Sequence, residues 1–546
     1  MTVSEEGSNR IPVLICGGGP IGLALAAELG WRGVRCAVIE QGDGIITTPK
    51  MNEINTRSME FCRRWGIADA VMNCPFPADF PLDAVFVTSL FGFEIARIPR
   101  APRRSQKPES YSPLRLTACS QHWFDPIMRR FVRSLPTVTL HHHHRLDSFE
   151  EIPGGIAVTV IDLKTGQIRR MTADYLVGCD GPASTVRRTL GIGLAGAGTL
   201  ATSLNLFFRA PDLLRLSGQV PGTFFFPVDK DGIWCSLRII EPDTGLWRLM
   251  VDNVGGADAA LTPESIDRDS YLHRALGRPF KVEWVETGVW RRRSVVAERY
   301  AQGRVFLAGD SVHQVSPTGA LGMNSGMGDA VDLGWKLAAT IQGWGGKNLL
   351  VSYDLERRPI GERNARAATG FFLNLGNFSR SERDFDADTA AGQSSRAKLA
   401  EILVRDIGRE FRTVGLQIGY RYVNSPISVP DGTPPPPDDP ERYAPSTWPG
   451  ARAPHAWLRD GLSTLDLFGR GFTLLRFPGA PDSGALSAAA ARRDVPLAMH
   501  DIVEPEVAEL YAKRLVLVRP DGHVAWRGDG PPSDPNAVID RVRGAL

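Results

Sequence analysis

The residues of this chain best suited to chemistry lie in three glycine-centred segments that are far apart in the sequence. The first, at 17–22, reads GGGPIG; the second, at 179–184, reads CDGPAS; the third, at 303–324, reads GRVFLAGDSVHQVSPTGALGMN. Glycines let the backbone approach a phosphate closely, and a helix that begins after them offers N–H donors. Three such segments in this order indicate a chain wrapped around one long dinucleotide, FAD.

The first segment predicts a strand, a tight turn and a helix. The apolar run 13–16 is typical of a buried parallel strand, residues 23–29 continue as a helix, and 34–39 form a second strand that ends in Glu40. Glu40 lies 18 residues beyond Gly22, the spacing of a carboxylate that accepts from ribose hydroxyls. The alternative is a glycine turn that only packs a helix on a strand. The expected cofactor contacts here are Gly17, Gly19, Pro20, Ile21, Gly22 and Glu40.

The third segment predicts a buried strand at 305–308 that delivers Gly309 and Asp310 to its carboxyl end, where open α/β sheets bind ligands. Asp310 there accepts from ribitol hydroxyls; the alternative is a helix N-cap. A helix is expected after the sequence Gly322-Met323-Asn324, and the positive end of its dipole would stabilise an anionic reduced flavin. One buried stripe is expected on it, formed by Met327, Val331, Gly334, Trp335 and Ala338.

Composition places the chain among globular proteins of two to four domains. It has 546 residues, 43% apolar and 23% charged, with a net charge of +2, which argues against nucleic acid or an anionic membrane as a partner. The N-terminal ten residues lack a signal-peptide core, and no apolar stretch is long enough to span a bilayer. The seven cysteines are scattered, so reduced thiols in the cytoplasm are expected.

Together these motifs resemble the FAD fingerprints of the class A flavoprotein aromatic hydroxylases, the family of p-hydroxybenzoate hydroxylase and phenol hydroxylase. The stretch Asp180-Gly181-Pro182-Ala183-Ser184-Thr185-Val186-Arg187 resembles the family's D-G-x-x-S-x-x-R, and Gly309-Asp310 resembles its G-D motif, with His313, Pro317, Gly319, Gly322 and Asn324 in step. The stretch NTRSME at 55–60 resembles the one whose arginine, here Arg57, reaches the FAD pyrophosphate. Gln121 resembles a glutamine on the flavin side of the cofactor.

The resemblance implies an FAD-dependent monooxygenase that consumes NADPH or NADH and hydroxylates a small phenol-like substrate with dioxygen, through a flavin C4a-hydroperoxide. It places the Pro317 carbonyl and the backbone around Gly319 near the reacting centre. Several relatives carry His or Asp five residues before the motif arginine, but this chain has Asn52, followed by Glu53. Asn cannot act as a general base, although it can hydrogen-bond a phenol. Asn52 is therefore expected to position the substrate. Either another group acts as the base, or the substrate is already acidic enough to ionise without one.

The expected fold class is α/β: a Rossmann-like FAD-binding domain with an inserted mixed β-sheet substrate domain and a C-terminal thioredoxin-like domain. The FAD-binding domain is assigned to 1–75, 110–193 and 291–345, and the substrate domain to 76–109 and 194–290. A helical segment at 346–428, a Pro-rich linker at 429–448 and the C-terminal domain at 449–546 follow; that domain contains no cysteine and so cannot run dithiol chemistry. A homodimer or higher homo-oligomer is also expected.

In the substrate domain, a hairpin turn is expected at 229–232. We expect one sheet face to carry Phe224, Phe226, Trp234 and Trp247.

Histidines invite two further interpretations. His313 is expected to be a structural hydrogen-bonding residue in a loop that folds on the flavin rather than a catalytic one. The run 141–144 is expected to lie within a strand, where neighbours point to opposite faces, so no metal site is predicted.

Other functions stay open at this point. A flavin halogenase should carry a W-x-W-x-I-P motif, which is absent here. A Baeyer–Villiger or epoxidising monooxygenase would share the fold, because a fold does not fix the chemistry. A non-catalytic flavin-binding or redox-sensing protein is a third possibility. An NAD-dependent dehydrogenase would leave two of the three glycine segments without a role.

Overall fold

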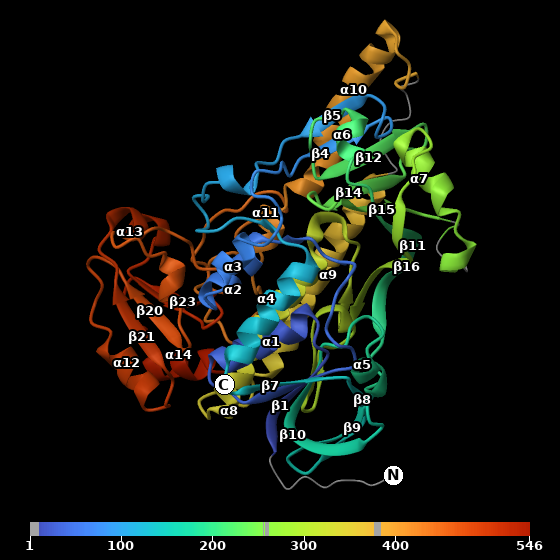
Figure 1. Ribbon diagram of the computed structural model, residues 1–546. Coiled ribbons are helices and arrows are strands. Elements are labelled where there is room, and N and C mark those ends of the chain that lie inside the picture. The colour runs from blue at the N-terminus through green and yellow to red at the C-terminus, as the bar shows by residue number, and fades with distance from the viewer. Residues whose placement is uncertain (1–9, 255, 257–260, 376–383) are drawn as a thin grey trace.

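The computed structural model describes residues 10–254, 256, 261–375 and 384–546. Its first sheet is mainly parallel, in the order β17-β18-β10-β1-β2-β7, and the antiparallel hairpin β8–β9 extends from β10 (Figure 1). The strands are β1 (Ile11–Cys16), β2 (Cys36–Glu40), β7 (Val138–His142), β8 (His144–Ile152), β9 (Gly155–Asp162), β10 (Ile168–Gly178), β17 (Ala301–Gln302) and β18 (Val305–Leu307). The predicted parallel strands at 13–16, 34–39 and 305–308 are confirmed within two residues.

Helices pack around this sheet. They are α1 (Pro20–Trp31), α2 (Thr56–Arg64), α3 (Ala68–Met72), α4 (Gln121–Ser134), α5 (Thr185–Thr189), α8 (Gly322–Ile341) and α9 (Val351–Asn374). Helix α1 contacts both α4 and α8, and α8 also contacts α9. The helix expected after Asn324 is confirmed, and all five residues of the expected stripe are buried, but burial is not limited to them: α8 is buried on almost every face, including its charged Asp332 and Lys336. A helix enclosed on all sides must pair its charges internally.

The second sheet is mixed and has the order β19-β16-β11-β15-β14-β12-β4-β5, with β13 paired to β12 (Figure 1). Its strands are β4 (Ala84–Val87), β5 (Glu94–Ile98), β11 (Leu194–Arg209), β12 (Phe224–Asp229), β13 (Gly232–Ile233), β14 (Cys235–Glu241), β15 (Leu246–Val251), β16 (Glu283–Ala297) and β19 (His313–Gln314). The hairpin at 229–232 is confirmed by the pairing of β12 with β13. The two expected chain segments build most of this sheet, but β16 runs to Ala297 rather than ending near 290, and β19 adds a third segment from the FAD-binding part.

The two faces of the second sheet carry different residues. One face packs Phe225 and Trp247 into an apolar core with the short helices α6 (Leu213–Ser217) and α7 (Arg268–Leu276), and Trp234 lies against that core. Phe224 and Phe226 stack on each other on the opposite face, where α10 (Ala390–Asp406) covers the β4–β5 edge. The expectation that the four aromatics share one face is therefore wrong, because side chains alternate along a strand.

The C-terminal part is a separate four-stranded sheet with three helices. Its order is β21-β20-β22-β23, with β20 and β21 parallel and the other pairs antiparallel. Its elements are β20 (Phe472–Arg476), α12 (Gly484–Ala491), β21 (Leu497–Asp501), α13 (Pro505–Tyr511), β22 (Leu515–Val518), β23 (Val524–Gly528) and α14 (Pro535–Val542). Residues 429–448, all of them described, form no helix or strand, as their proline content predicts.

The histidine run does not lie within one strand. Strand β7 ends at His142, His143 adopts a positive φ of 59°, and β8 begins at His144. The chain therefore turns inside the run, which corrects the expected continuous strand. Within the described ranges, no group of three or more His, Cys, Asp or Glu side chains could hold a metal ion. No described helix is both long and apolar enough to cross a membrane.

Candidate functional site: a flavin cradle beside a cationic chamber

Parallel pairing brings the three glycine segments to one edge of the first sheet. Strands β18, β10 and β1 are neighbours; β1 and β10 end directly before the first and second segments, and β18 lies within the third and ends shortly before Gly309. Backbone bonds join them: Cys179 N–H donates to the Cys16 carbonyl (2.7 Å) and Ala308 N–H to the Gly178 carbonyl (3.0 Å). The carboxyl ends of adjacent parallel strands are where such sheets bind nucleotides.

The first segment forms a turn that only glycine fits. Gly17 has a φ of 106°, and a Cβ there would lie 2.3 Å from the Cys179 carbonyl oxygen; a Cβ on Gly22 would lie 1.8 Å from the Gly17 oxygen. Helix α1 then starts without a side-chain cap, so its first N–H groups are free to meet an anion. Glu40 accepts from the Gly18 and Gly42 N–H groups, both at 2.7 Å, which places its carboxylate beside the turn. Pro20 and Ile21 begin the helix.

The second segment is held together by its own aspartate. Asp180 accepts from the Ser184 hydroxyl (2.5 Å) and from the Val186 N–H (3.1 Å), next to Gly181 with its φ of 77°. Arg187 then donates to the Ser311 carbonyl (2.9 Å) in the third segment. The D-G-x-x-S-x-x-R pattern therefore links two of the three segments, and the cofactor contact of Asp180 and Gly181 stays a prediction.

In the third segment, Gly309, Asp310 and Ser311 form the short helix η3. The Asp310 side chain is exposed in the cleft, and desolvation by the surrounding protein raises its pKa, against the opposing effect of His313 and Lys50.

His313 itself is buried and lies 2.8 Å from Asp329. Burial alone would lower the pKa of His313, but Asp329 raises it. Since Asp329 also accepts from the Gly309 N–H (3.2 Å) and from Arg357 (2.9 Å), His313 belongs to a structural network.

The start of α8 is arranged as an open anion-binding end. Helix α8 has no side-chain cap, so the N–H groups of Gly322 and Met323 are available. Asn324 accepts from the Asn55 N–H (2.9 Å) and donates to the Glu53 (3.2 Å) and Ala320 (2.8 Å) carbonyls.

Just before α8, Pro317 is exposed and Gly319 has a φ of 79° within the short helix η4 (Thr318–Ala320). The Asn324 bonds therefore fix the loop that the resemblance places beside the reacting centre.

Two further expected residues have protein partners. Gln121 accepts from the Lys50 N–H (3.1 Å) and donates to Asp125 (3.2 Å). Asn52 is 5% exposed, and its Oδ1 accepts from the Ser120 hydroxyl at 2.9 Å. Asn52 also belongs to the seam between β3 (Glu53–Ile54) and β6 (Thr117–Ala118). These bonds leave the proposed substrate-positioning role of Asn52 a prediction.

Arg57 has protein partners. Its guanidinium donates to Glu60 (2.8 Å) and to the Asp521 carbonyl (2.7 Å), and it packs 4.6 Å over the Phe61 ring. Arg452 of the C-terminal region also binds Glu60. Arg57 therefore lies at the contact between the FAD-binding and C-terminal parts, and its role at the pyrophosphate stays a prediction.

On the substrate side, the second sheet presents charged residues to the first domain. Phe224 and Arg238 are cross-strand partners, and so are Arg238 and Arg248, which puts all three on one face. The Arg238 guanidinium lies 4.1 Å over the Phe224 ring. On the same side, Arg292 of β16 donates to the Ser316 hydroxyl (2.7 Å), directly before Pro317. We use the name substrate chamber for the region around these four residues, Phe224, Arg238, Arg248 and Arg292.

Arg248 is the exceptional residue of the chamber. Glu53 pairs with Arg100 (3.1 Å) and Arg238 (3.5 Å), and Asp252 pairs with Arg292. Arg248 is only 8% exposed, yet no hydrogen bond or ion pair reaches it from the part of the chain that the structure describes. Burial lowers the pKa of Arg248 to about 10, so the group stays charged at neutral pH. A buried, charged and unpaired guanidinium is costly unless a ligand supplies the anion.

The sequence analysis missed Arg238, Arg248 and Arg292. A signal was present: the stretches CSLRIIE and LWRLMV place an arginine inside otherwise apolar strands. A charge in such a position is rarely buried without a partner or a function. Recognising the chamber, however, needs the strand pairing that puts these arginines together.

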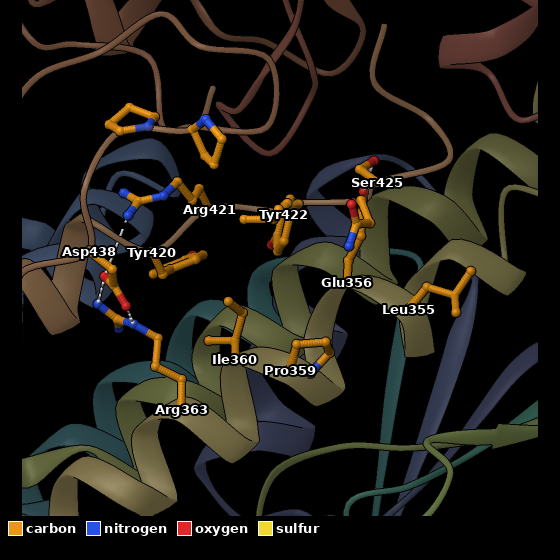
Figure 2. A pocket seen from close by; sticks show the side chains of 14 residues that line it. Leu355, Glu356, Pro359, Ile360, Arg363, Tyr420, Arg421, Tyr422, Ser425 and Asp438 are labelled. Atoms are coloured by element: carbon orange, nitrogen blue, oxygen red, sulfur yellow. Dashed lines mark hydrogen bonds and ion pairs between the residues drawn. The ribbon is translucent and has the colours of Figure 1, made fainter. Parts of the chain in front are cut away.

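A cavity of about 420 Å³ lies elsewhere, between α9 and the segment 420–438 (Figure 2). It is lined by Tyr420, Ile360 and prolines, with Arg363 and Arg421 at one side. Both arginines already lie against Asp438, at 2.7 and 3.8 Å. Because its charges are paired and none of the three glycine segments reaches it, we do not assign the chemistry to this cavity.

The fold and the site together define a flavoprotein of the monooxygenase class. Residues 10–368 match the FAD binding domain model, and residues 446–545 match the model of the aromatic-ring hydroxylase C-terminal domain. The chain belongs to the class A FAD-dependent aromatic-ring hydroxylases, and it is an FAD-dependent aromatic monooxygenase.

Relatives match along nearly the whole chain. The FAD-dependent monooxygenase apdD of Emericella nidulans is 33% identical, over 98% of this chain and 90% of the relative. The structure of RebC, soaked with chromopyrrolic acid and containing bound 7-carboxy-K252c, is 40% identical, with a TM-score of 0.91 over 98% of this chain and 99% of RebC. The monooxygenase PieE, in complex with FAD and substrate, is 33% identical, with a TM-score of 0.85 over 99% of both chains.

Proposed function

We propose that this protein uses NADPH or NADH, FAD and dioxygen to hydroxylate a phenol-like ring in an extended aromatic substrate that also carries a carboxylate. The observation that supports a carboxylate on the substrate is Arg248, whose buried charge has no partner within the described residues. RebC, whose fold matches 98% of this chain, was soaked with chromopyrrolic acid and contains bound 7-carboxy-K252c, a carboxy compound. A carboxylate beside Arg248 would make charge-assisted hydrogen bonds in a water-poor space.

The residues at the strand ends support the cofactor assignment. The uncapped starts of α1 and α8 would face the pyrophosphate and the flavin, and Glu40 and Asp310 would accept from ribose and ribitol hydroxyls. Bound flavin supplies hydride acceptance from NAD(P)H and activation of dioxygen. The protein supplies orientation, a fixed Pro317–Asn324 loop and exclusion of water.

The C-terminal region supports a thioredoxin-like assignment in topology alone. Its strand order β21-β20-β22-β23, with a helix on either side of β21, is that of a thioredoxin core, and it has no cysteine for redox chemistry. The domain boundaries stay a proposal, with the substrate domain extended from 290 to 297 to include β16, and with α10 assigned as a cover for the second sheet. The homo-oligomer and the cytoplasmic location stay predictions.

Product mass after turnover under isotopically labelled dioxygen tests the function. The FAD-loaded protein would be given NADPH or NADH and a panel of polycyclic phenols, with and without a carboxylate. We expect one labelled oxygen atom in the product and faster turnover for the acids. Cofactor oxidation that yields only hydrogen peroxide with every member would contradict hydroxylation of this substrate class.

A further inference from the structure

Glu410 lies at the wall of the substrate chamber, in the short helix η5 (Ile407–Phe411) far along the chain from the glycine segments. Helix η5 packs directly against η4, the Thr318–Ala320 turn beside Pro317, and against α9. The next residue, Phe411, lies 6.2 Å from both Phe224 and Phe226, ring centre to ring centre. The position of Glu410 is therefore fixed from two sides, by the second sheet and by the loop near the reacting centre.

The charges around Glu410 come from every side of the chamber. They are Arg292 of β16, Asp252 after β15, Arg100 after β5 and Glu53 of β3. Arg292 is committed to Asp252 and Ser316, and Arg100 to Glu53. The Arg100 guanidinium also packs 5.4 Å over the Phe411 ring. The two cations nearest Glu410 are thus already paired with other acids.

Glu410 differs from the other acids of the chamber in having no partner. It is half-buried, and within the described ranges no hydrogen bond or ion pair involves its carboxyl group. Desolvation raises the pKa of Glu410 to about 8, with Arg292 opposing and Asp252 adding to that effect. Glu53, in contrast, has its pKa lowered by Arg100 and Arg238, although burial alone would raise it. Of these two, only Glu410 can take up and release a proton near neutral pH.

We propose that Glu410 is the catalytic residue that exchanges a proton with the ring hydroxyl of the substrate. This inference rests on the proposed function, since it concerns the same chamber and the same phenol-like ring. It also answers the question raised by Asn52, which occupies the place of the His or Asp found in several relatives and cannot act as a base. His313 is not available for the task, because Asp329 holds it in the buried network.

The proton balance is simple. The Glu410 carboxylate accepts the hydroxyl proton as the ring donates electrons from the adjacent carbon to the oxygen atom being transferred. The ring carbon then loses its own proton to solvent, and the ring becomes aromatic again. Glu410 returns its proton to the substrate oxygen and is a carboxylate for the next turnover. The oxygen atom comes from dioxygen, whose O–O bond breaks as the new carbon–oxygen bond forms, and the second oxygen atom leaves as water with the two electrons that NAD(P)H supplies.

A binding experiment tests this assignment without any turnover. The probe is a nitrophenol that also carries a carboxylate, because its phenol and phenolate forms absorb at different wavelengths. The probe is titrated from acid to alkaline pH while bound to FAD-loaded wild type and to Glu410→Gln. We expect the bound phenol to ionise at least about one pH unit lower in wild type, because the protonated Glu410 carboxyl donates a stronger hydrogen bond to the phenolate than the Gln amide does. Glu401→Gln, an exposed change on the preceding helix α10, should behave as wild type.

A second readout separates a proton role from a structural one. Glu410→Asp keeps the acid and should restore a low phenol pKa, whereas Glu410→Gln should not. The FAD absorbance spectrum and melting temperature should be the same in all these proteins. The same probe titration in wild type and Glu410→Gln, or no binding of the probe to wild type, would overturn the assignment. Failure of the hydroxylase function would appear separately, as absence of labelled product.

Discussion

Arg519, in the turn between β22 and β23, and Glu356 of α9 form an ion pair from which water is excluded. The Arg519 Nη1–Glu356 Oε1 distance is 2.6 Å, and both side chains are completely buried. Glu356 also accepts from Lys336 of α8 (2.6 Å), and Arg519 reaches Asp332 of α8 (3.1 Å). One turn earlier in α8, Asp329 accepts a hydrogen bond from the Gly309 N–H. The C-terminal domain is therefore joined by buried charges to the helix that shapes the flavin cradle.

Removing one partner of this network should be strongly destabilising. Arg519→Met leaves Glu356 and Asp332 buried with less compensation, and we expect a loss of roughly 3–5 kcal/mol in unfolding free energy. Weaker retention of FAD should accompany it. Arg476→Met breaks a partly exposed pair with Asp501 in the same domain and should cost less than about 1 kcal/mol. Thermal melting with and without FAD measures both; equal effects would contradict the importance of the buried pair.

The same network predicts a specific acid sensitivity. Although burial alone would raise it, Arg519 and Lys336 lower the pKa of Glu356 to about 2. A lowered folded-state pKa contributes stability above the unfolded value, near 4.3, which is lost as pH falls toward 2. We expect stability to fall across this window in wild type, and Glu356→Gln to remove this part of the pH dependence. An unchanged slope in Glu356→Gln, measured by denaturant unfolding at several pH values, would contradict the network.

Two neighbouring glycines should respond differently to the same substitution. Gly22→Ala would place a Cβ against the Gly17 oxygen, so we expect a lower melting temperature even without cofactor. Gly19→Ala meets no protein atom within 4 Å, so the fold should be unaffected, while FAD binding should weaken because backbone must approach the pyrophosphate there. Melting of the apoprotein and titration with FAD separate the two. Wild-type FAD affinity in Gly19→Ala would remove that residue from the cradle.

Arg57 allows its role in the domain contact to be separated from a role at the cofactor. Arg57→Met should lower the melting temperature, because Glu60 loses one of its two buried cations, while FAD affinity should change by less than about threefold if the domain contact is the main role of Arg57. Lys50 is an exposed cation beside Asp310. The FAD affinity of Lys50→Met therefore shows how much the loss of a nearby positive charge alone changes cofactor binding. A large loss of FAD affinity without loss of stability in Arg57→Met would support the pyrophosphate role.

The sequence predicted the parts of the site that are built from local patterns. The glycine turn at Gly17, the strand that delivers Asp310 and the start of α8 each depend on residues close in the chain, where spacing and periodicity carry the information. The contacts of Arg57 with Glu60 and Asp521 were not predicted, because one of these partners lies in another domain. Arg248 and Glu410 were missed for the same reason: their surroundings arise from strand pairing and from η5, which lies more than a hundred residues beyond β15.

The most direct measurement is the affinity of the FAD-loaded protein for a polycyclic phenol carboxylic acid and for its methyl ester, in wild type and in Arg248→Met. A charge-assisted bond in a buried site predicts that wild type binds the acid at least about tenfold more tightly than the ester. Arg248→Met should lose that preference while keeping its affinity for the ester. Equal affinities for acid and ester in wild type would contradict an acidic substrate held by Arg248.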